Sequence, residues 1–332
     1  MKTSGSSRVL DLIVSLDKQL AFGLAAGRKA AVKSAGLTKV LFCGMGGSAI
    51  GGEILSALAA RTGRGPIVVS RSPVPPKWAD KNTLAIFSSY SGNTRETLEA
   101  FNTIRRTKAQ MVAVTSNGRL RALADTDGIT RISIPPGLPP RCAVGYLTFS
   151  LLPLLKKAGW LGYSDKDLRE AEGLVRKNTR AGAPALKIAR QLKGRLVHLY
   201  GFGGILRPAV LRWRAQIAEN SKNQTSHHWM PEMFHNEIEG WVNPKGLAAK
   251  STAVFLTDHE DPAWVLKKMR AAAALFKKRG GRALILKSAG KSPLARLFSM
   301  IALGDRVSWE LARLNGVDPM PIPAIEAVKK IN

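Results

Sequence analysis

Two short segments combine glycines with Ser and Thr hydroxyls where an apolar run gives way to a helix-like stretch. In "GMGGSAIGG" these residues are Gly47 and Ser48, and in "SSYSGNTRET" they are Ser89, Ser91 and Thr94. The N-terminus of a helix carries free backbone N–H groups and the positive end of the helix dipole, and both attract anions. The two segments therefore predict a binding site for a phosphate group, formed by these five residues.

Each segment taken alone admits another interpretation. "GMGGSA" fits the G-x-G-x-x-A pattern of dinucleotide-binding folds. The next apolar run ends in "VVSRS", which has no acidic residue for a ribose and only Arg71 for a 2′-phosphate. "SGNT" also suits simple capping of a helix. No G-x-x-x-x-G-K-[ST] pattern occurs, which disfavours a P-loop nucleotide site. Two such turns in one predicted sheet favour phosphate binding over these alternatives.

A second part of the chain concentrates acid–base side chains. The segment "AENSKNQTSHHWMPEMFHNEIEGW" holds three of the five histidines of the chain, together with four glutamates. A Glu and a His in one segment suit general acid–base catalysis. The spacing matches no HExxH pattern and no cysteines lie nearby, so a metal site is disfavoured. His227 and His228 are predicted to belong to a solvated loop.

Alternating strands and helices must position these residues. In the first half, apolar runs typical of buried parallel strands alternate with helix-like stretches, which predicts the α/β class with a doubly wound sheet flanked by helices. A single long helix is expected at 143–159. The expected strands are 39–46, 66–72, 83–91, 110–118 and 129–135. The remaining expected helices are 48–61, 94–108 and 119–125.

The second half begins the same pattern again. "RLVHLYGFGGILRPAV" repeats the strand, the G-x-G-G turn and the helix of "KVLFCGMGGSAIGGEI", and further strands follow it. This indicates two domains of one α/β type, at residues 1–155 and 156–332. The first copy has Ser48 after its glycines where the second has Ile205, so only the first is expected to bind an anion.

The composition disfavours other function classes. The net charge is +28, but the basic residues are spread along the chain without aromatic residues between them, which disfavours nucleic-acid binding. No apolar run reaches the length of a membrane span, and the N-terminus indicates an amphipathic helix rather than a secretion signal. With only two cysteines, Cys43 and Cys142, the chain suits a reducing cytoplasm.

Six segments together resemble the bifunctional phosphoglucose/phosphomannose isomerases, a family built from two sugar isomerase (SIS) domains. They follow one another over nearly the whole chain: "GMGGSAIGG", "SSYSGNTRETL", "PRCAVGYLTF", "AENSK", "HNEIEGW" and "DPMPIPAIEAVKK". The resemblance implies a cytoplasmic homodimer that interconverts glucose 6-phosphate and mannose 6-phosphate with fructose 6-phosphate through a cis-enediol. It also implies that the reaction needs neither a cofactor nor a metal.

The same resemblance implies catalytic roles for four residues. Glu219 matches the base that moves a proton between C2 and C1. His235 matches the residue that opens the sugar ring and that comes from the partner subunit. Arg141 matches the arginine that stabilises the enediolate, and Lys329 matches a C-terminal lysine at the ring oxygen, with the adjacent Lys330 as its alternative.

The main alternative is a SIS protein that binds a sugar phosphate without catalysis, as a sensor or regulator. The four catalytic-type residues disfavour it, because a sensor needs only the phosphate site. The family usually has Ala where this chain has Ser221. Amino-sugar isomerisation, as in the glutamine-dependent synthases, requires an N-terminal cysteine domain that is not expected here.

Overall fold

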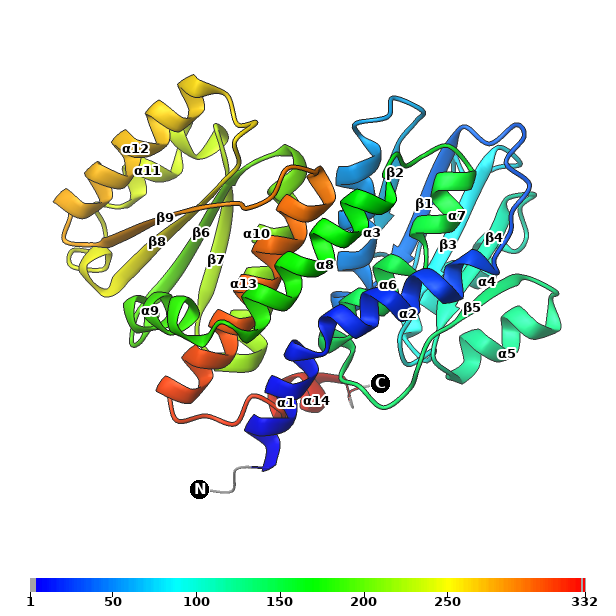
Figure 1. Cartoon of the computed structure of the whole chain (residues 1–332), viewed down its shortest axis with the longest axis horizontal. Coiled ribbons are helices and arrows are strands. Elements are labelled where there is room, and N and C mark those ends of the chain that lie inside the picture. The colour runs from blue at the N-terminus through cyan, green and yellow to red at the C-terminus, as the bar shows by residue number, and fades with distance from the viewer. Residues whose placement is uncertain (1–3, 330, 332) are drawn as a thin grey trace. The chain divides into compact units, whose positions relative to one another are not determined.

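The computed structural model describes residues 4–329 and residue 331, and the chain divides into two compact units (Figure 1). The first unit comprises Ser15–Gly173. The second unit comprises Leu174–Asn332 together with Met1–Val14. Within the described residues, no helix combines the length and the apolar character that a bilayer crossing demands.

The division lies beyond the boundary expected at 155/156. The segment after that boundary still packs on the first unit, where Trp160 is fully buried and its carbonyl accepts a hydrogen bond from the Thr62 hydroxyl (3.0 Å). The N-terminal helix α1, Ser4–Val14, belongs to the second unit, where the Trp309 indole donates to the Ser6 carbonyl (2.8 Å). A boundary at 155/156 therefore assigns neither attachment to its unit.

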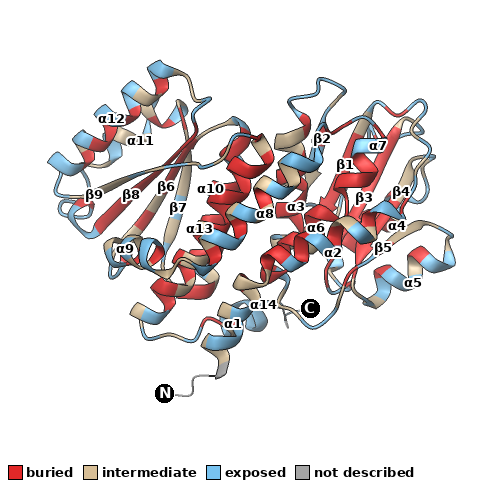
Figure 2. Ribbon diagram, in the orientation of Figure 1, coloured by how far each residue is buried: buried red, intermediate tan, exposed pale blue. Residues whose placement is uncertain are grey.

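The first unit is built on a five-stranded parallel sheet in the order β2-β1-β3-β4-β5, which confirms the predicted doubly wound class. Every residue of its central strand β3 is buried (Figure 2), as expected for a parallel sheet with helices on both faces. The strands are β1 Lys39–Gly44, β2 Ile67–Ser70, β3 Thr83–Ser88, β4 Gln110–Thr115 and β5 Thr130–Ser133. The helices up to the end of the sheet are α2 Leu16–Arg28, α3 Gly46–Ala59, α4 Arg95–Ile104 and α5 Gly118–Thr126.

The single helix expected at 143–159 is wrong, since two short helices stand there: α6, Val144–Phe149, and α7, Leu152–Lys157. Pro153 has no backbone N–H to donate to the carbonyl four residues earlier, so α6 does not continue through it, and Pro153 instead lies in the first turn of α7, where that bond is not needed. A short 3-10 helix, η1, Pro140–Cys142, precedes them.

The second unit repeats the arrangement with a four-stranded parallel sheet in the order β7-β6-β8-β9. Helix α8, Asp165–Arg180, contains the division between the units. The strands are β6 Leu196–Phe202, β7 Thr225–Met230, β8 Ser251–Thr257 and β9 Arg282–Lys287. The helices are α9 Gly182–Leu192, α10 Arg207–Ser221, α11 Glu237–Gly240, α12 Ala263–Lys278, α13 Pro293–Leu314 and α14 Pro323–Lys329, with 3-10 helices η2 Gly204–Leu206, η3 Glu232–His235 and η4 Ala248–Lys250.

The prediction that His227 and His228 lie in a loop is wrong, because both lie in the edge strand β7. Met230 is the one buried residue among the six of this edge strand, so the sequence shows no apolar alternation there. The His227 ring packs edge-on against Trp229, with 5.3 Å between the ring centroids.

A buried ion pair joins α10 to α13 and provides a stability prediction for the second unit. Arg212 donates to both carboxylate oxygens of Asp305 (2.8 and 2.7 Å), and Gln216 donates to the same carboxylate (3.1 Å). Arg212→Met leaves Asp305 buried without its cation, so we expect a loss of about 3–5 kcal/mol in the free energy of unfolding. Chemical denaturation measures it. The double variant with Asp305→Leu should lose clearly less, and an equal loss in both variants would contradict a charge effect.

Candidate active site

The turn after β1 presents backbone N–H groups and one hydroxyl at the N-terminus of α3. Gly46 adopts φ 47°, a left-handed conformation that favours glycine and turns the chain sharply into the helix. The buried Ser48 hydroxyl accepts a hydrogen bond from the backbone N–H of Tyr90 (3.2 Å). This bond joins the turn after β1 to the turn after β3, so the two predicted phosphate-binding segments lie side by side.

The turn after β3 gathers the other three predicted phosphate ligands. The hydroxyls of Ser89 and Thr94 lie 2.9 Å apart, and the Ser91 hydroxyl accepts from the backbone N–H of Asn93 (3.2 Å). Gly92 also donates its N–H to Ser89 (3.1 Å). Thr94 precedes α4 without making a side-chain cap hydrogen bond among the described residues. Simple helix capping therefore does not explain this segment, and the N–H groups of the first turn of α4 are open to an anion.

Arg141 lies beside this phosphate-type site, within the first unit. A Cβ added to Gly47 would stand 2.7 Å from the Pro140 carbonyl oxygen and 3.1 Å from the Arg141 Cα, so only glycine allows η1 to approach α3 this closely. Tyr90 holds the preceding loop, because its hydroxyl donates to the Pro135 carbonyl (2.8 Å) and accepts from the Leu138 N–H (2.9 Å). All six predicted residues of this unit thus meet at the carboxyl edge of the sheet.

The two acid–base candidates of the second unit lie at opposite edges of its sheet. Helix α10 returns from the carboxyl end of β6 to the amino end of β7, and Glu219 lies in its last turn. His235 follows the carboxyl end of β7 and is exposed. The six residues of β7 span about 20 Å, so the two side chains of one chain cannot reach the same small substrate.

The C-terminal segment lies near the end of α10. The Lys222 ammonium donates to the carbonyl oxygens of both Glu219 and Pro321, the latter at 2.7 Å, which holds the approach to α14 beside Glu219. Lys329, at the end of α14, is exposed. Its alternative, Lys330, lies outside the described residues.

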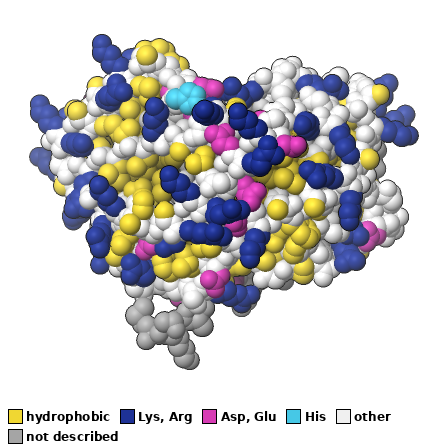
Figure 3. Space-filling model, viewed as in Figure 1, with side chains coloured by type: hydrophobic (Ala, Val, Ile, Leu, Met, Phe, Trp, Pro, Cys, Tyr) yellow, Lys and Arg dark blue, Asp and Glu magenta, His cyan; other side chains and the backbone are white. Residues whose placement is uncertain are grey.

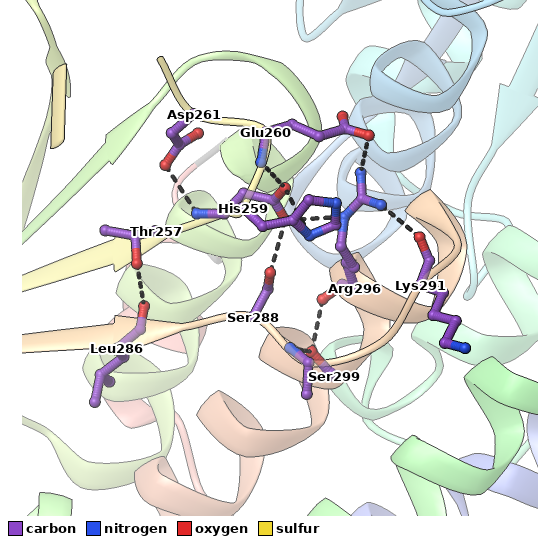
Figure 4. Close-up of polar contacts among 11 residues, drawn as sticks. Thr257, His259, Glu260, Asp261, Leu286, Ser288, Lys291, Arg296 and Ser299 are labelled. Carbon is purple, nitrogen blue, oxygen red and sulfur yellow. Dashed lines mark hydrogen bonds and ion pairs between the residues drawn. The ribbon is translucent and has the colours of Figure 1, made fainter. Parts of the chain in front are cut away.

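An ion-pair cluster lies at the carboxyl edge of the second sheet. The hydroxyl-rich turns occupy the corresponding edge of the first sheet. The buried Arg296 guanidinium contacts Asp258 (3.1 Å) and Glu260 (2.8 Å), and it donates to the Lys291 carbonyl (2.6 Å; Figure 4). Sequence analysis missed Arg296, because only the fold brings it from α13 to this edge. Its guanidinium is already engaged by carboxylates, which supports the expectation that the second copy does not bind an anion.

Asp261 of the same cluster provides a pH-dependent prediction. Burial, together with the charges of Asp258 and Glu260, raises the pKa of Asp261 to about 6 from an ordinary 3.8. Between pH 3.8 and about pH 6, Asp261 keeps its proton in the folded state but has lost it in the unfolded state. Asp261 therefore lowers the free energy of unfolding as the pH rises through this range. Asp261→Asn should therefore raise the melting temperature at pH 8 and leave it nearly unchanged at pH 4. An equal shift at both pH values would contradict this pKa.

The described residues hold no group of three or more His, Cys, Asp or Glu arranged to bind a metal ion. Lys and Arg side chains are scattered over the visible face of the molecule rather than gathered in one patch (Figure 3). The surface charge therefore does not mark a second candidate site on this face.

Comparison with known proteins identifies the family to which the chain belongs. The family model for the bacterial phospho-glucose isomerase C-terminal SIS domain matches residues 182–331. The chain is 37% identical to a bifunctional phosphoglucose/phosphomannose isomerase of Caldicellulosiruptor bescii over 306 residues, which cover 90% of each chain. It is 32% identical to a protein of the same name from Aquifex aeolicus over 293 residues, or 88% of this chain and 89% of the relative.

A solved structure with low sequence identity has the same fold. A hypothetical protein from Thermus thermophilus aligns with a TM-score of 0.76 at 16% identity, over 99% of this chain and 92% of its own. An identity this low shows the fold alone. The relatives at 30% identity or more are what identify the family.

Proposed function

The chain belongs to the family of bifunctional phosphoglucose/phosphomannose isomerases, and we propose that it interconverts glucose 6-phosphate and mannose 6-phosphate with fructose 6-phosphate. The observation that carries this proposal is the junction of the hydroxyl-rich turns with Arg141 in the first unit. The turns supply neutral donors for a phosphate, and the adjacent guanidinium supplies a cation for an oxyanion that develops during the reaction.

In this proposal the phosphate binds to Gly47, Ser48, Ser89, Ser91 and Thr94. The substrate then extends toward Arg141, whose side chain is almost fully buried and is thus held in one place. Arg141 stabilises the negative oxygen of the cis-enediolate as the proton leaves carbon. A buried, fixed cation needs no rearrangement when that charge appears, so it lowers the energy of the transition state more than that of the bound sugar.

The acid–base steps fall to residues of the second unit. The Glu219 carboxylate takes the proton from C2 of the open-chain aldose and returns it to C1, which gives the ketose. His235 transfers the proton that opens the sugar ring, and Lys329 assists at the ring oxygen. These steps move protons only, so we propose that the enzyme uses no redox cofactor and no metal.

The placement of two of these residues supports a homodimer. Glu219 and His235 of one chain lie at opposite edges of the second sheet, and a hexose is far shorter than the strand between them. Both act on one substrate only if a second copy supplies His235. We therefore propose a dimer in which each active site takes its histidine from the partner subunit. Neither Cys43 nor Cys142 forms a disulfide among the described residues, and a location in the reducing cytoplasm is proposed on that basis.

The activity is tested by a coupled assay on chelator-treated protein. Glucose 6-phosphate and mannose 6-phosphate are offered separately, and fructose 6-phosphate is followed. We expect formation from both substrates. Binding of both sugar phosphates without turnover of either would overturn the proposal in favour of a sensor, and restoration of lost activity by added zinc would contradict the metal-free mechanism.

The double variant Ser89→Ala, Thr94→Ala tests the phosphate site. It removes two adjacent hydroxyls that bind the ground state and the transition state alike, so KM should rise about tenfold or more while kcat changes little. Steady-state kinetics on glucose 6-phosphate measures both. The control is the double variant Ser164→Ala, Thr103→Ala, which removes two exposed hydroxyls. An unchanged KM in the test variant would mean that the phosphate does not bind at Ser89 and Thr94.

A further inference from the structure

The segment that carries His235 is attached to the second unit on both sides of that histidine. We call residues 231–241 the His235 segment. Met233 is fully buried, and Phe234, Ile238 and Trp241 pack against the same apolar cluster. His235 itself is exposed. Buried apolar residues therefore anchor the segment, while His235 stays exposed to solvent.

A polar contact joins this segment to β6, one of the two inner strands of the sheet. The hydroxyl of Tyr200, in β6, donates a hydrogen bond to Glu237 Oε1 at 2.7 Å. The Tyr200 and Trp241 rings also lie close together, with 6.3 Å between their centroids. Glu237 is two residues from His235, so this contact sets the position of the backbone that holds the histidine.

Tyr200 is itself held rigidly. Its side chain is fully buried, and its ring stacks on Phe255 of the neighbouring strand β8 with 5.0 Å between the ring centroids. Burial and the Glu237 carboxylate raise the pKa of Tyr200, so its hydroxyl keeps its proton and remains a donor over the working pH range. A hydrogen bond to a carboxylate in such surroundings is stronger than one between neutral groups.

Asn236 completes the attachment from within the segment. Its side-chain oxygen accepts from the Glu237 N–H (2.6 Å) at the start of α11, and its amide donates to Glu232 (2.8 Å). These two bonds link the residues on both sides of His235 to each other. A shift of the Glu237 side chain is thereby passed to the histidine.

We propose that Tyr200 and Glu237 are positioning residues for ring opening: their hydrogen bond places His235 of one chain for use in the active site of its partner. This rests on the proposed function, in which His235 opens the sugar ring in trans. In this proposal, neither residue contacts the substrate bound at the active site that contains Glu219 of the same chain. Their effect is on the neighbouring active site.

The first test separates the hydrogen bond from packing. Tyr200→Phe and Glu237→Ala each remove the contact, and each should lower kcat on glucose 6-phosphate about tenfold or more with KM nearly unchanged. Glu237→Gln keeps an oxygen that accepts from Tyr200, so it should retain most of the rate that Glu237→Ala loses. Equal loss in both Glu237 variants, or a change confined to KM, would overturn the assignment.

The second test asks on which active site Tyr200 acts. Tyr200→Phe chains are unfolded and refolded together with Glu219→Gln chains, and the activity of the mixture is compared with that of each variant alone. In a mixed dimer one site combines an intact Glu219 with a His235 from a chain that has Tyr200, so activity should rise severalfold. Absence of any rise would mean that Tyr200 acts within its own site or only on folding.

A reference mixture of His235→Ala with Glu219→Gln distinguishes failure of this inference from failure of the proposed function. If the reference mixture recovers activity and the Tyr200→Phe mixture does not, the positioning role is wrong and the shared active site stands. If neither mixture recovers activity, the supply of His235 from the partner is wrong, and the positioning role falls with it.

Discussion

Glu219→Gln is expected to lower kcat for glucose 6-phosphate about a thousandfold or more, while the binding of the sugar phosphate stays close to that of the unmodified chain. A glutamine has nearly the shape of the glutamate but cannot accept the proton from C2, and loss of a general base costs this much. The fold should survive, because the neighbouring Asn220 is held by Ser308 (2.9 Å) independently of Glu219. Steady-state kinetics measures turnover, and calorimetric titration with fructose 6-phosphate measures binding.

Glu99→Gln is the matched control for this experiment. It makes the same chemical change at an exposed residue whose partner is Arg95, one turn earlier on α4, and such surface pairs contribute little to stability. Its kcat should equal that of the unmodified chain. Substantial turnover by the Glu219→Gln protein would assign the base to another residue and leave the phosphate site unaffected.

A mixture of His235→Ala and Glu219→Gln chains is expected to regain activity that neither variant has alone. Each variant should be impaired about a hundredfold or more on cyclic sugars, since each lacks a proton-transfer group. In a mixed dimer, one active site receives Glu219 from one chain and His235 from the other. Random pairing makes half of the dimers mixed with one complete site each, which gives about a quarter of the unmodified activity.

The reconstitution must be carried out by unfolding and refolding the two chains together. Mixing the folded proteins without unfolding is the control, because it should restore activity only as fast as the dimers exchange subunits. Full-length chains are used throughout, and the dimer is verified by light scattering. A mixture that stays as inactive as its components would mean that Glu219 and His235 do not meet across two chains.

Much of the first unit could be predicted from the sequence, because its inner strands β1 and β3 are almost entirely buried. Such strands are near-continuous apolar runs, and β1 and β3 stand out for this reason. The glycines and hydroxyls that follow them are equally visible. The meeting of Ser48 with Tyr90 follows from the fold rule that neighbouring parallel strands end at one edge of a sheet.

The second unit was less predictable where its structure depends on contacts distant in sequence. Strand β7 consists largely of polar residues, and only its pairing with β6 identifies it as a strand. Arg296 and Tyr200 lie in apolar stretches typical of structural elements, and their partners are Asp258 and Glu237. No local pattern links residues this far apart, so these contacts could not be inferred before the fold was known.

The ion-pair cluster around Arg296 has an evolutionary consequence for the two repeated units. If both arose from one ancestral domain, the edge that we propose to bind phosphate in the first unit corresponds to an ion-paired, structural edge in the second. Substitutions at Arg296 should therefore alter melting temperature more than KM, and those at Ser89 the reverse. Among homologues, loss of the arginine should be accompanied by loss of Asp258 or Glu260, since a lone buried charge is costly. The hydroxyl-rich turns should instead vary only where the ligand itself has changed.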